Sequence, residues 1–252
     1  MILLTGATGF VGGSLVHRML KEKLHVRCLV RSYKKAETLN AIGVETAIGD
    51  ITDKSSILKA MEGVETVVHL VGILVEVGKA TFDLMHTEGT RNMVEAAKEK
   101  GIKRFIHMSA LGTRQDAKSK YHKTKLAAEE IVKNSGLDYA IFRPSVIFGR
   151  EDNFTNMFAK AIKMSPFIMV PGSGKNKMQP VSVKDVAEAI TAAVVDKRFA
   201  GTYELGGPEK LTFDEIIDKI CGILNKKRSS IYGDYPSKTT FDKRPTPYAS
   251  GR

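Results

Sequence analysis

Short apolar runs alternate along the chain with longer stretches in which apolar residues recur every three or four positions. The runs predict six strands, at residues 2–4, 25–30, 44–48, 66–71, 104–108 and 138–142. The stretches between them predict helices, the clearest of which cover residues 54–61, 79–100 and 120–135. Strands that alternate with helices are typical of βαβ units, in which the strands pair in parallel. The sequence therefore predicts an α/β fold with a parallel sheet.

A glycine-rich turn, TGATGFVG, joins the first strand to the first helix. Gly6 permits a tight turn, Gly9 lets the backbone approach a pyrophosphate, and Gly12 lets the helix pack close to the sheet. The amino end of the helix adds free N–H groups and a positive dipole end. The turn therefore predicts a Rossmann-type, doubly wound sheet with a dinucleotide site that includes Thr8, Phe10 and Val11. The alternative is a strand, turn and helix with no ligand.

The nucleotide-binding pattern ends at Gly149. We expect residues 1–149 to form the dinucleotide-binding domain and residues 150–228 to form a small C-terminal substrate or docking lobe. In this lobe the pattern predicts helices at 153–164, 184–195 and 212–224, and strands at 167–170 and 202–205. Residues 229–252 have no hydrophobic period, which predicts a disordered or truncated tail.

Composition narrows the class of protein. The 252 residues are 42% hydrophobic, and no apolar run approaches the ~18–20 residues of a membrane-spanning helix. The chain begins with its first strand, so we expect no signal peptide and a cytoplasmic location. Cys28 and Cys221 lack the spacing of metal ligands. We therefore expect two buried thiols and no metal site.

The net charge of +11 raises nucleic acid or an anionic membrane surface as partners. The charge is uneven, because residues 226–252 alone carry seven basic and two acidic side chains. No basic helix is interleaved with aromatic residues. A phosphate-rich cofactor and a solvated lysine surface account for the remaining charge, so we expect no nucleic-acid partner.

Arg31 follows the second strand, where NAD-specific folds usually place an acidic residue on the ribose 2′-hydroxyl. No Asp or Glu stands there. Arg31, with Ser32, Lys34 and Lys35 behind it, is suited to a 2′-phosphate. The sequence therefore predicts NADP(H) in preference to NAD(H). The alternative is that Arg31 is a surface arginine without this role.

Tyr121 and Lys125 lie four residues apart in a predicted helix, so their side chains share one helical face. A neighbouring ammonium favours the phenolate form of tyrosine. The pair could therefore exchange a proton with a substrate hydroxyl or carbonyl group. Ser109, at the end of the preceding strand, would orient the substrate oxygen. Together the three residues predict an acid–base set.

Seven segments carry a family resemblance: TGATGFVG, GDITD, HTEGTRN, HMSALG, YHKTK, FRPSVIFG and DNFTNMF. Together they resemble the extended and atypical short-chain dehydrogenase/reductase superfamily, whose members are NAD-dependent epimerase/dehydratase-like. The resemblance covers roughly residues 1–224. It is closest to atypical members similar to the NADPH-binding 39-kDa-type accessory subunit of respiratory complex I.

The resemblance implies further cofactor contacts. Asp50 would accept from the exocyclic amine of adenine, and Ile51 would pack on its ring; the alternative for Asp50 is helix capping. The remaining contacts would lie near the nicotinamide half, at Leu70, Val71, Gly72, His86, Met108, Pro144, Ser145 and Val146. His86 stands where the family commonly has Asn, which leaves a site-facing and a packing role open.

The serine position also departs from the family, which often has two hydroxyl residues in a row here. This chain has Ser109 followed by Ala110. Ser109 could serve, Thr113 could substitute, or the hydroxyl could be missing. His69 lies inside a predicted strand, and we expect it to be a core residue.

Two function hypotheses follow from the resemblance. In the first, the chain is an NADP(H)-dependent oxidoreductase or epimerase-like enzyme that uses Tyr121, Lys125 and Ser109. In the second, it is a non-catalytic NADPH-holding subunit or assembly factor of a respiratory NADH:quinone oxidoreductase-type complex, peripheral to the inner membrane. A nucleotide-sensing regulator is a weaker third reading. The sequence does not identify the substrate or the oligomeric state.

Overall fold

The computed structural model describes residues 1–165, 167–227 and 229–233, which form two compact units. Unit 1 comprises residues 1–156 and 178–210, and unit 2 comprises residues 157–177 and those from 211 onward. The sequence predicts a boundary at residue 149 and assigns residues 150–228 to the lobe. In the structure the chain instead returns to unit 1 for residues 178–210, because these residues complete its sheet.

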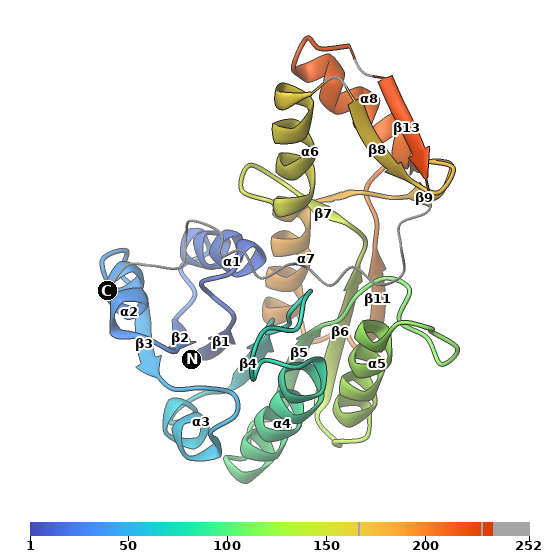
Figure 1. Cartoon of the computed structure of the whole chain (residues 1–252). Coiled ribbons are helices and arrows are strands. Elements are labelled where there is room, and N and C mark those ends of the chain that lie inside the picture. Colours follow the sequence, from blue (N-terminus) through green and yellow to red (C-terminus); the bar gives the residue numbers. More distant parts are fainter. Residues whose placement is uncertain (166, 228, 234–252) are drawn as a thin grey trace. The chain divides into compact units, whose positions relative to one another are not determined.

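A seven-stranded sheet forms the centre of unit 1 (Figure 1), in the order β11-β6-β5-β4-β1-β2-β3. All of its strand pairs are parallel, which confirms the predicted Rossmann-type fold. Its strands are β1 (Ile2–Thr5), β2 (Val26–Val30), β3 (Glu45–Ile48), β4 (Thr66–His69), β5 (Arg104–Met108), β6 (Asp138–Pro144) and β11 (Gly201–Leu205). The chain order reverses between β1 and β4. In open α/β sheets, ligands bind beyond the carboxyl ends of the strands at such a point.

Helices cover both faces of the sheet because their apolar sides are buried against it. One core cluster joins the sheet to α1 (Phe10–Lys21), α2 (Tyr33–Asn40) and α7 (Val183–Val195). The other joins it to α3 (Lys54–Ala60), α4 (Gly89–Glu99) and α5 (Lys120–Lys133). The remaining strands of unit 1, β7 (Ile147–Phe148) and β10 (Val181–Ser182), pair with each other.

The predicted helix over residues 79–100 is interrupted at its start. Val77 and Ala80 form a two-residue bridge, and a π-helix, η1 (Asp83–Glu88), precedes α4. The hydrophobic period alone cannot separate a π-helix from an α-helix here, because the apolar spacing continues through both.

Unit 2 contains most of α6 (Asn153–Met164) and the helix α8 (Phe213–Ile223). Thr212 and Glu215 form a reciprocal capping box at the start of α8. Its strand β8 (Phe167–Pro171) pairs in parallel with β13 (Ser229–Gly233). The remaining short strands are β9 (Lys177–Met178) and β12 (Leu211–Thr212).

The strand β13 corrects the prediction of an unstructured tail for its first five residues. Its order comes from backbone pairing with a strand some 60 residues earlier, which a local hydrophobic period does not reveal. Residues 234–252 lie outside the described part of the chain. Among the described residues, no helix is long and apolar enough to span a membrane.

Two buried histidines lie side by side in the sheet, with ring centroids 5.5 Å apart. His69 forms hydrogen bonds with Thr5 at 2.7 Å and Thr90 at 3.2 Å, as expected of a core residue. His107 has no hydrogen-bond partner for either ring nitrogen among the described residues. Burial lowers the pKa of His69 to about 3 and holds the pKa of His107 well below its usual value. Both rings are therefore neutral in the folded protein.

Acid should therefore destabilise unit 1. Below the ordinary histidine pKa of 6.5 the unfolded chain binds protons that the folded chain excludes, so stability falls as the pH falls. Each such histidine costs about 2 kcal/mol between pH 7.5 and 5.0. We expect His107→Leu to raise the free energy of unfolding and to weaken its pH dependence, measured by urea denaturation at both pH values. An unchanged pH dependence would contradict this account.

Candidate functional site

The turn between β1 and α1 has the close geometry that its glycines predict. Gly6 has φ +79°, and its carbonyl oxygen accepts a hydrogen bond from the Gly9 N–H at 3.0 Å. A Cβ atom added to Gly12 would lie 2.1 Å from the same oxygen. Thr8 and Gly9 are exposed at the start of α1, which has no side-chain cap. Phe10 is half-buried, and Val11 is buried.

This turn fits the pyrophosphate of a dinucleotide. The first N–H groups of α1 lack intrahelical partners, and the exposed Gly9 places no Cβ atom before them. A side chain at Gly12 would push the helix away from the turn. The turn is therefore open to a ligand at Gly9, and its packing against α1 requires glycine at position 12.

The basic residues after β2 are exposed and free to meet a phosphate. Arg31, Lys34 and Lys35 form no ion pair within the described residues, and Ser32 caps α2 by accepting from the Lys35 N–H. This arrangement is compatible with the predicted 2′-phosphate contact.

Asp50 and Ile51 lie after β3 but differ in what they can offer an adenine ring. Asp53 caps α3, so Asp50 is not needed as the cap; its Oδ1 accepts from the Thr52 N–H at 2.9 Å instead. The Ile51 side chain is 4% exposed, and a Cβ on Gly89 would lie 2.4 Å from its Cδ1. Ile51 therefore packs in the core at the start of α4, which favours a packing role, and the expected contact of its side chain with adenine stays a prediction.

The end of β4 meets Lys125 beneath the predicted nicotinamide position. Leu70 is buried against Gly6, while Val71 is half-buried and Gly72 exposed. A Cβ atom on Gly72 would lie 2.9 Å from the Lys125 Nζ. That ammonium also donates to the Met108 carbonyl oxygen at 3.0 Å. The structure thus brings together Gly72, Met108 and Lys125 from three separate elements.

Lys125 is 3% exposed and forms no ion pair within the described residues. Burial lowers its pKa to about 8, against an opposing effect of the Glu129 charge. Tyr121 is half-buried, and burial raises the pKa of its hydroxyl. Burial therefore dominates the pKa of Tyr121 while the Lys125 ammonium donates to the Met108 carbonyl oxygen, and the expected lowering of that pKa by Lys125 stays a prediction.

Ser109 is buried, and its hydroxyl group contacts other side chains of the protein. Its hydroxyl lies 3.4 Å from that of Thr113, itself buried, and also contacts Glu129. Glu129 is fully buried and accepts two hydrogen bonds from Arg143, at 2.8 and 2.6 Å. Burial opposes ionisation of Glu129, but the hydrogen bonds from Arg143 and Ser109 hold its pKa below the usual range.

Sequence reasoning missed this Glu129–Arg143 pair. The available signals were that Glu129 lies one helical turn beyond Lys125 and that Arg143 immediately precedes Pro144. The pair joins α5 to the end of β6, and thus fixes the two segments that flank Ser109.

The backbone after β6 is also fixed on both sides. The Pro144 carbonyl accepts from the Leu111 N–H at 2.9 Å, and the Ser145 N–H donates to the Leu205 carbonyl at 2.8 Å. The Val146 carbonyl accepts from Val181 at 2.9 Å. Pro144 is buried, whereas Ser145 and Val146 are half-buried.

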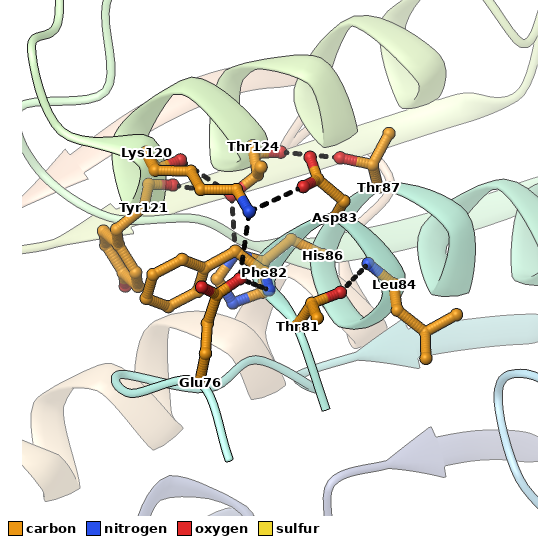
Figure 2. Close-up of polar contacts among 10 residues, drawn as sticks. All are labelled: Glu76, Thr81, Phe82, Asp83, Leu84, His86, Thr87, Lys120, Tyr121 and Thr124. Atoms are coloured by element: carbon orange, nitrogen blue, oxygen red, sulfur yellow. Dashed lines mark hydrogen bonds and ion pairs between the residues drawn. The ribbon is translucent and has the colours of Figure 1, made fainter. Parts of the chain in front are cut away.

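His86 is a packing residue, the second of the two roles left open by the sequence. Its Nδ1 bonds the Thr124 hydroxyl at 3.0 Å, and its Nε2 lies 3.0 Å from the Ile73 backbone nitrogen. Figure 2 shows the ring between η1 and α5, beside Phe82 and Tyr121. Burial lowers the pKa of His86 to about 4. Both ring nitrogens are engaged within the protein, which favours the packing role over a contact with the cofactor.

Comparison with known proteins agrees with this geometry. A model described as NAD(P)H-binding matches residues 6–197. The chain belongs to the NAD(P)H-binding family. Its relatives place the family within the extended short-chain dehydrogenase/reductase and NAD-dependent epimerase-like superfamily.

Two curated relatives are the mitochondrial NADH dehydrogenase (ubiquinone) 1 alpha subcomplex subunit 9 of Arabidopsis thaliana and of Mus musculus. They are 34% and 32% identical over 88% of this chain. The chain spans only 57% and 60% of their lengths. Among solved structures, the Citrobacter sp. triphenylmethane reductase complexed with NADP(H) has a TM-score of 0.81 at 25% identity, over 93% of this chain and 80% of its own.

Substitutions at two neighbouring glycines test whether the turn between β1 and α1 binds the cofactor. Gly12→Ala should clash with the Gly6 carbonyl oxygen, costing about 1–3 kcal/mol and abolishing NADPH binding. Gly13→Ala is the matched control, because a Cβ there meets nothing within 4 Å; it should stabilise α1 by about 0.5–1 kcal/mol and leave binding intact. Thermal denaturation and NADPH fluorescence report the two effects. Normal binding by Gly12→Ala would rule out this role of the turn.

Proposed function

We propose that this chain binds NADP(H) and acts as an oxidoreductase that reduces a carbonyl group with Tyr121 as the acid. One observation carries the proposal: the Lys125 ammonium is buried at the edge of Gly72 without an ion-pair partner among the described residues. A buried, unpaired ammonium is costly to fold around. Such a cost is typical of a functional site.

The roles follow from the positions of the residues. A bound nicotinamide would supply the hydride from its C4 atom. Tyr121 would donate its proton to the substrate oxygen, and the ammonium of Lys125 would stabilise the negative charge left on the phenol. Lys125 could also bond the nicotinamide ribose in place of the Met108 carbonyl. Because Ser109 and Thr113 are buried, we propose that no hydroxyl from this strand end orients the substrate.

The preference for NADP(H) rests on Arg31. Its guanidinium is exposed beside Lys34 and Lys35, with no acidic residue at the end of β2. The Citrobacter reductase, whose fold is similar, is described in complex with NADP(H).

Removal of this guanidinium should separate the two cofactors. We expect Arg31→Ala to weaken NADPH binding about 10–100-fold, as for the loss of a charge-assisted hydrogen bond, and to leave NADH binding unchanged. Lys98→Ala, at another exposed position of unit 1, controls for the change in net charge. Fluorescence titration with each cofactor gives the affinities. Equal effects on NADPH and NADH would refute the assignment.

The acid–base pair can be tested by turnover, binding and stability together. Tyr121→Phe should lose carbonyl reduction but keep NADPH binding. Lys125→Met should lose both, yet gain up to about 3 kcal/mol of stability at pH 7, since it no longer buries an ammonium. The wild type should also gain stability as the pH rises from about 8 to 10.5, because the unfolded chain still binds the proton there. Lower stability of Lys125→Met would contradict the proposed burial cost.

A second candidate is a non-catalytic NADPH-holding subunit of a membrane complex, peripheral to the membrane. It is favoured by the two relatives named above and by the engagement of Ser109 with Glu129. Native fractionation of source cells distinguishes the candidates. Migration with a large membrane complex, with biological function kept in Tyr121→Phe and lost when the Gly6–Gly12 turn is disrupted, would favour the subunit.

A further inference from the structure

Three aliphatic side chains are exposed within four residues of the segment that follows β4. Leu74 is 77% exposed, Val75 61% and Val77 72%. Single exposed aliphatic residues are ordinary, but a contiguous group of them marks a place where an apolar partner binds. We call residues 74–77 the apolar segment.

The apolar segment is held in place by polar contacts rather than by burial of its own side chains. Glu76 accepts from the Lys120 Nζ at 3.1 Å and from the Phe82 N–H at 2.7 Å (Figure 2). Val77 and Ala80 exchange two backbone hydrogen bonds, at 3.1 and 3.0 Å. Lys120 also pairs with Asp83 at 2.9 Å. The one carboxylate in the segment is therefore held by Lys120, which it shares with Asp83, and its aliphatic neighbours remain exposed.

These anchors place the apolar segment beside Tyr121. Lys120, which holds Glu76, directly precedes Tyr121 at the start of α5. Phe82, whose N–H also holds Glu76, packs edge-to-face with Tyr121. The two ring centroids are 5.8 Å apart. The Ile73 backbone, just before the segment, contacts the His86 Nε2 atom. The His86 ring also packs on Tyr121, with ring centroids 5.3 Å apart. The segment and the proposed acid are thus joined by one set of polar and ring contacts.

We propose that the apolar segment binds the apolar body of the substrate, which is a ketone with an aromatic or aliphatic body rather than a nucleotide sugar. This inference rests on the proposed function. In the reaction the hydride adds to the carbonyl carbon and Tyr121 gives its proton to the carbonyl oxygen. The C=O double bond becomes a C–OH single bond, NADPH becomes NADP⁺, and solvent returns the proton to Tyr121. The segment offers such a substrate three aliphatic side chains, and its one carboxylate is held by Lys120 and the Phe82 N–H.

Methyl NMR of the full chain with NADP⁺ tests binding without turnover. With leucine and valine methyl groups labelled, propiophenone should shift the signals of Leu74, Val75 and Val77, and UDP-glucose should not. The double variant Val75→Ser/Val77→Ser should bind propiophenone about tenfold more weakly, because two aliphatic contacts are lost. Val195→Ser, whose parent side chain is 65% exposed in unit 1, is the matched control and should bind normally.

The inference would be overturned by shifts with UDP-glucose but not with propiophenone, or by unchanged binding of propiophenone to the double variant. A mass in solution that differs between the double variant and the wild type would also overturn it, because the segment would then be a contact between copies. Ketone reduction that depends on Tyr121 without shifts at these methyl groups would also overturn it, and would leave the proposed function standing. Shifts as expected without any reduction by the wild type would support the segment's role and count against the proposed function alone.

Discussion

The close approach of α1 to the turn after β1 is the constraint on which the site depends. A Cβ atom on Gly12 would lie 2.1 Å from the Gly6 carbonyl oxygen, so this packing exists only because residue 12 lacks a side chain. The approach holds the amino end of α1, whose first N–H groups lack intrahelical partners, directly after β1, where the strand order reverses. Arg31, Asp50 and Gly72 follow neighbouring strands at this same edge of the sheet.

Two buried charged side chains of the site, Glu129 and Lys125, differ in how well the protein satisfies them. Glu129 is fully satisfied, with Arg143, Lys133 and Ser109 around it, and therefore belongs to the framework. Lys125, one helical turn earlier, has only the Met108 carbonyl oxygen as a hydrogen-bond partner within the described part of the chain. Burial lowers the pKa of Lys125, and the opposing effect of the Glu129 charge is smaller. The framework thus keeps a poorly satisfied ammonium beside Gly72, where a ligand could satisfy it.

The sequence predicted those features that depend on local pattern. Six strands, the glycine turn and the shared face of Tyr121 and Lys125 each follow from spacing within some 12 residues. The wrong predictions concern segments whose structure depends on a strand that is distant in the sequence. Residues 178–210 join unit 1 because β11 pairs with β6, and β13 forms because β8 offers it a backbone edge.

The sequence also did not predict the direction in which several side chains point. Ile51, His86 and Ser109 lie in the expected elements, but Gly89, Thr124 and Glu129 respectively engage them from elsewhere in the chain. A motif fixes which element carries a residue; its neighbours in space decide whether that residue faces a ligand or the core. This is also why Tyr121, whose pKa burial raises, differs from the simple expectation for a Tyr–Lys pair.

A crystal structure of the chain with NADP⁺ bound would test the central claim most directly. The account predicts the pyrophosphate on the N–H groups at the start of α1, the 2′-phosphate on Arg31, and the Lys125 Nζ on the nicotinamide ribose. A dinucleotide bound away from the Gly6–Gly12 turn, or one whose ribose leaves Lys125 on the Met108 carbonyl oxygen, would contradict it.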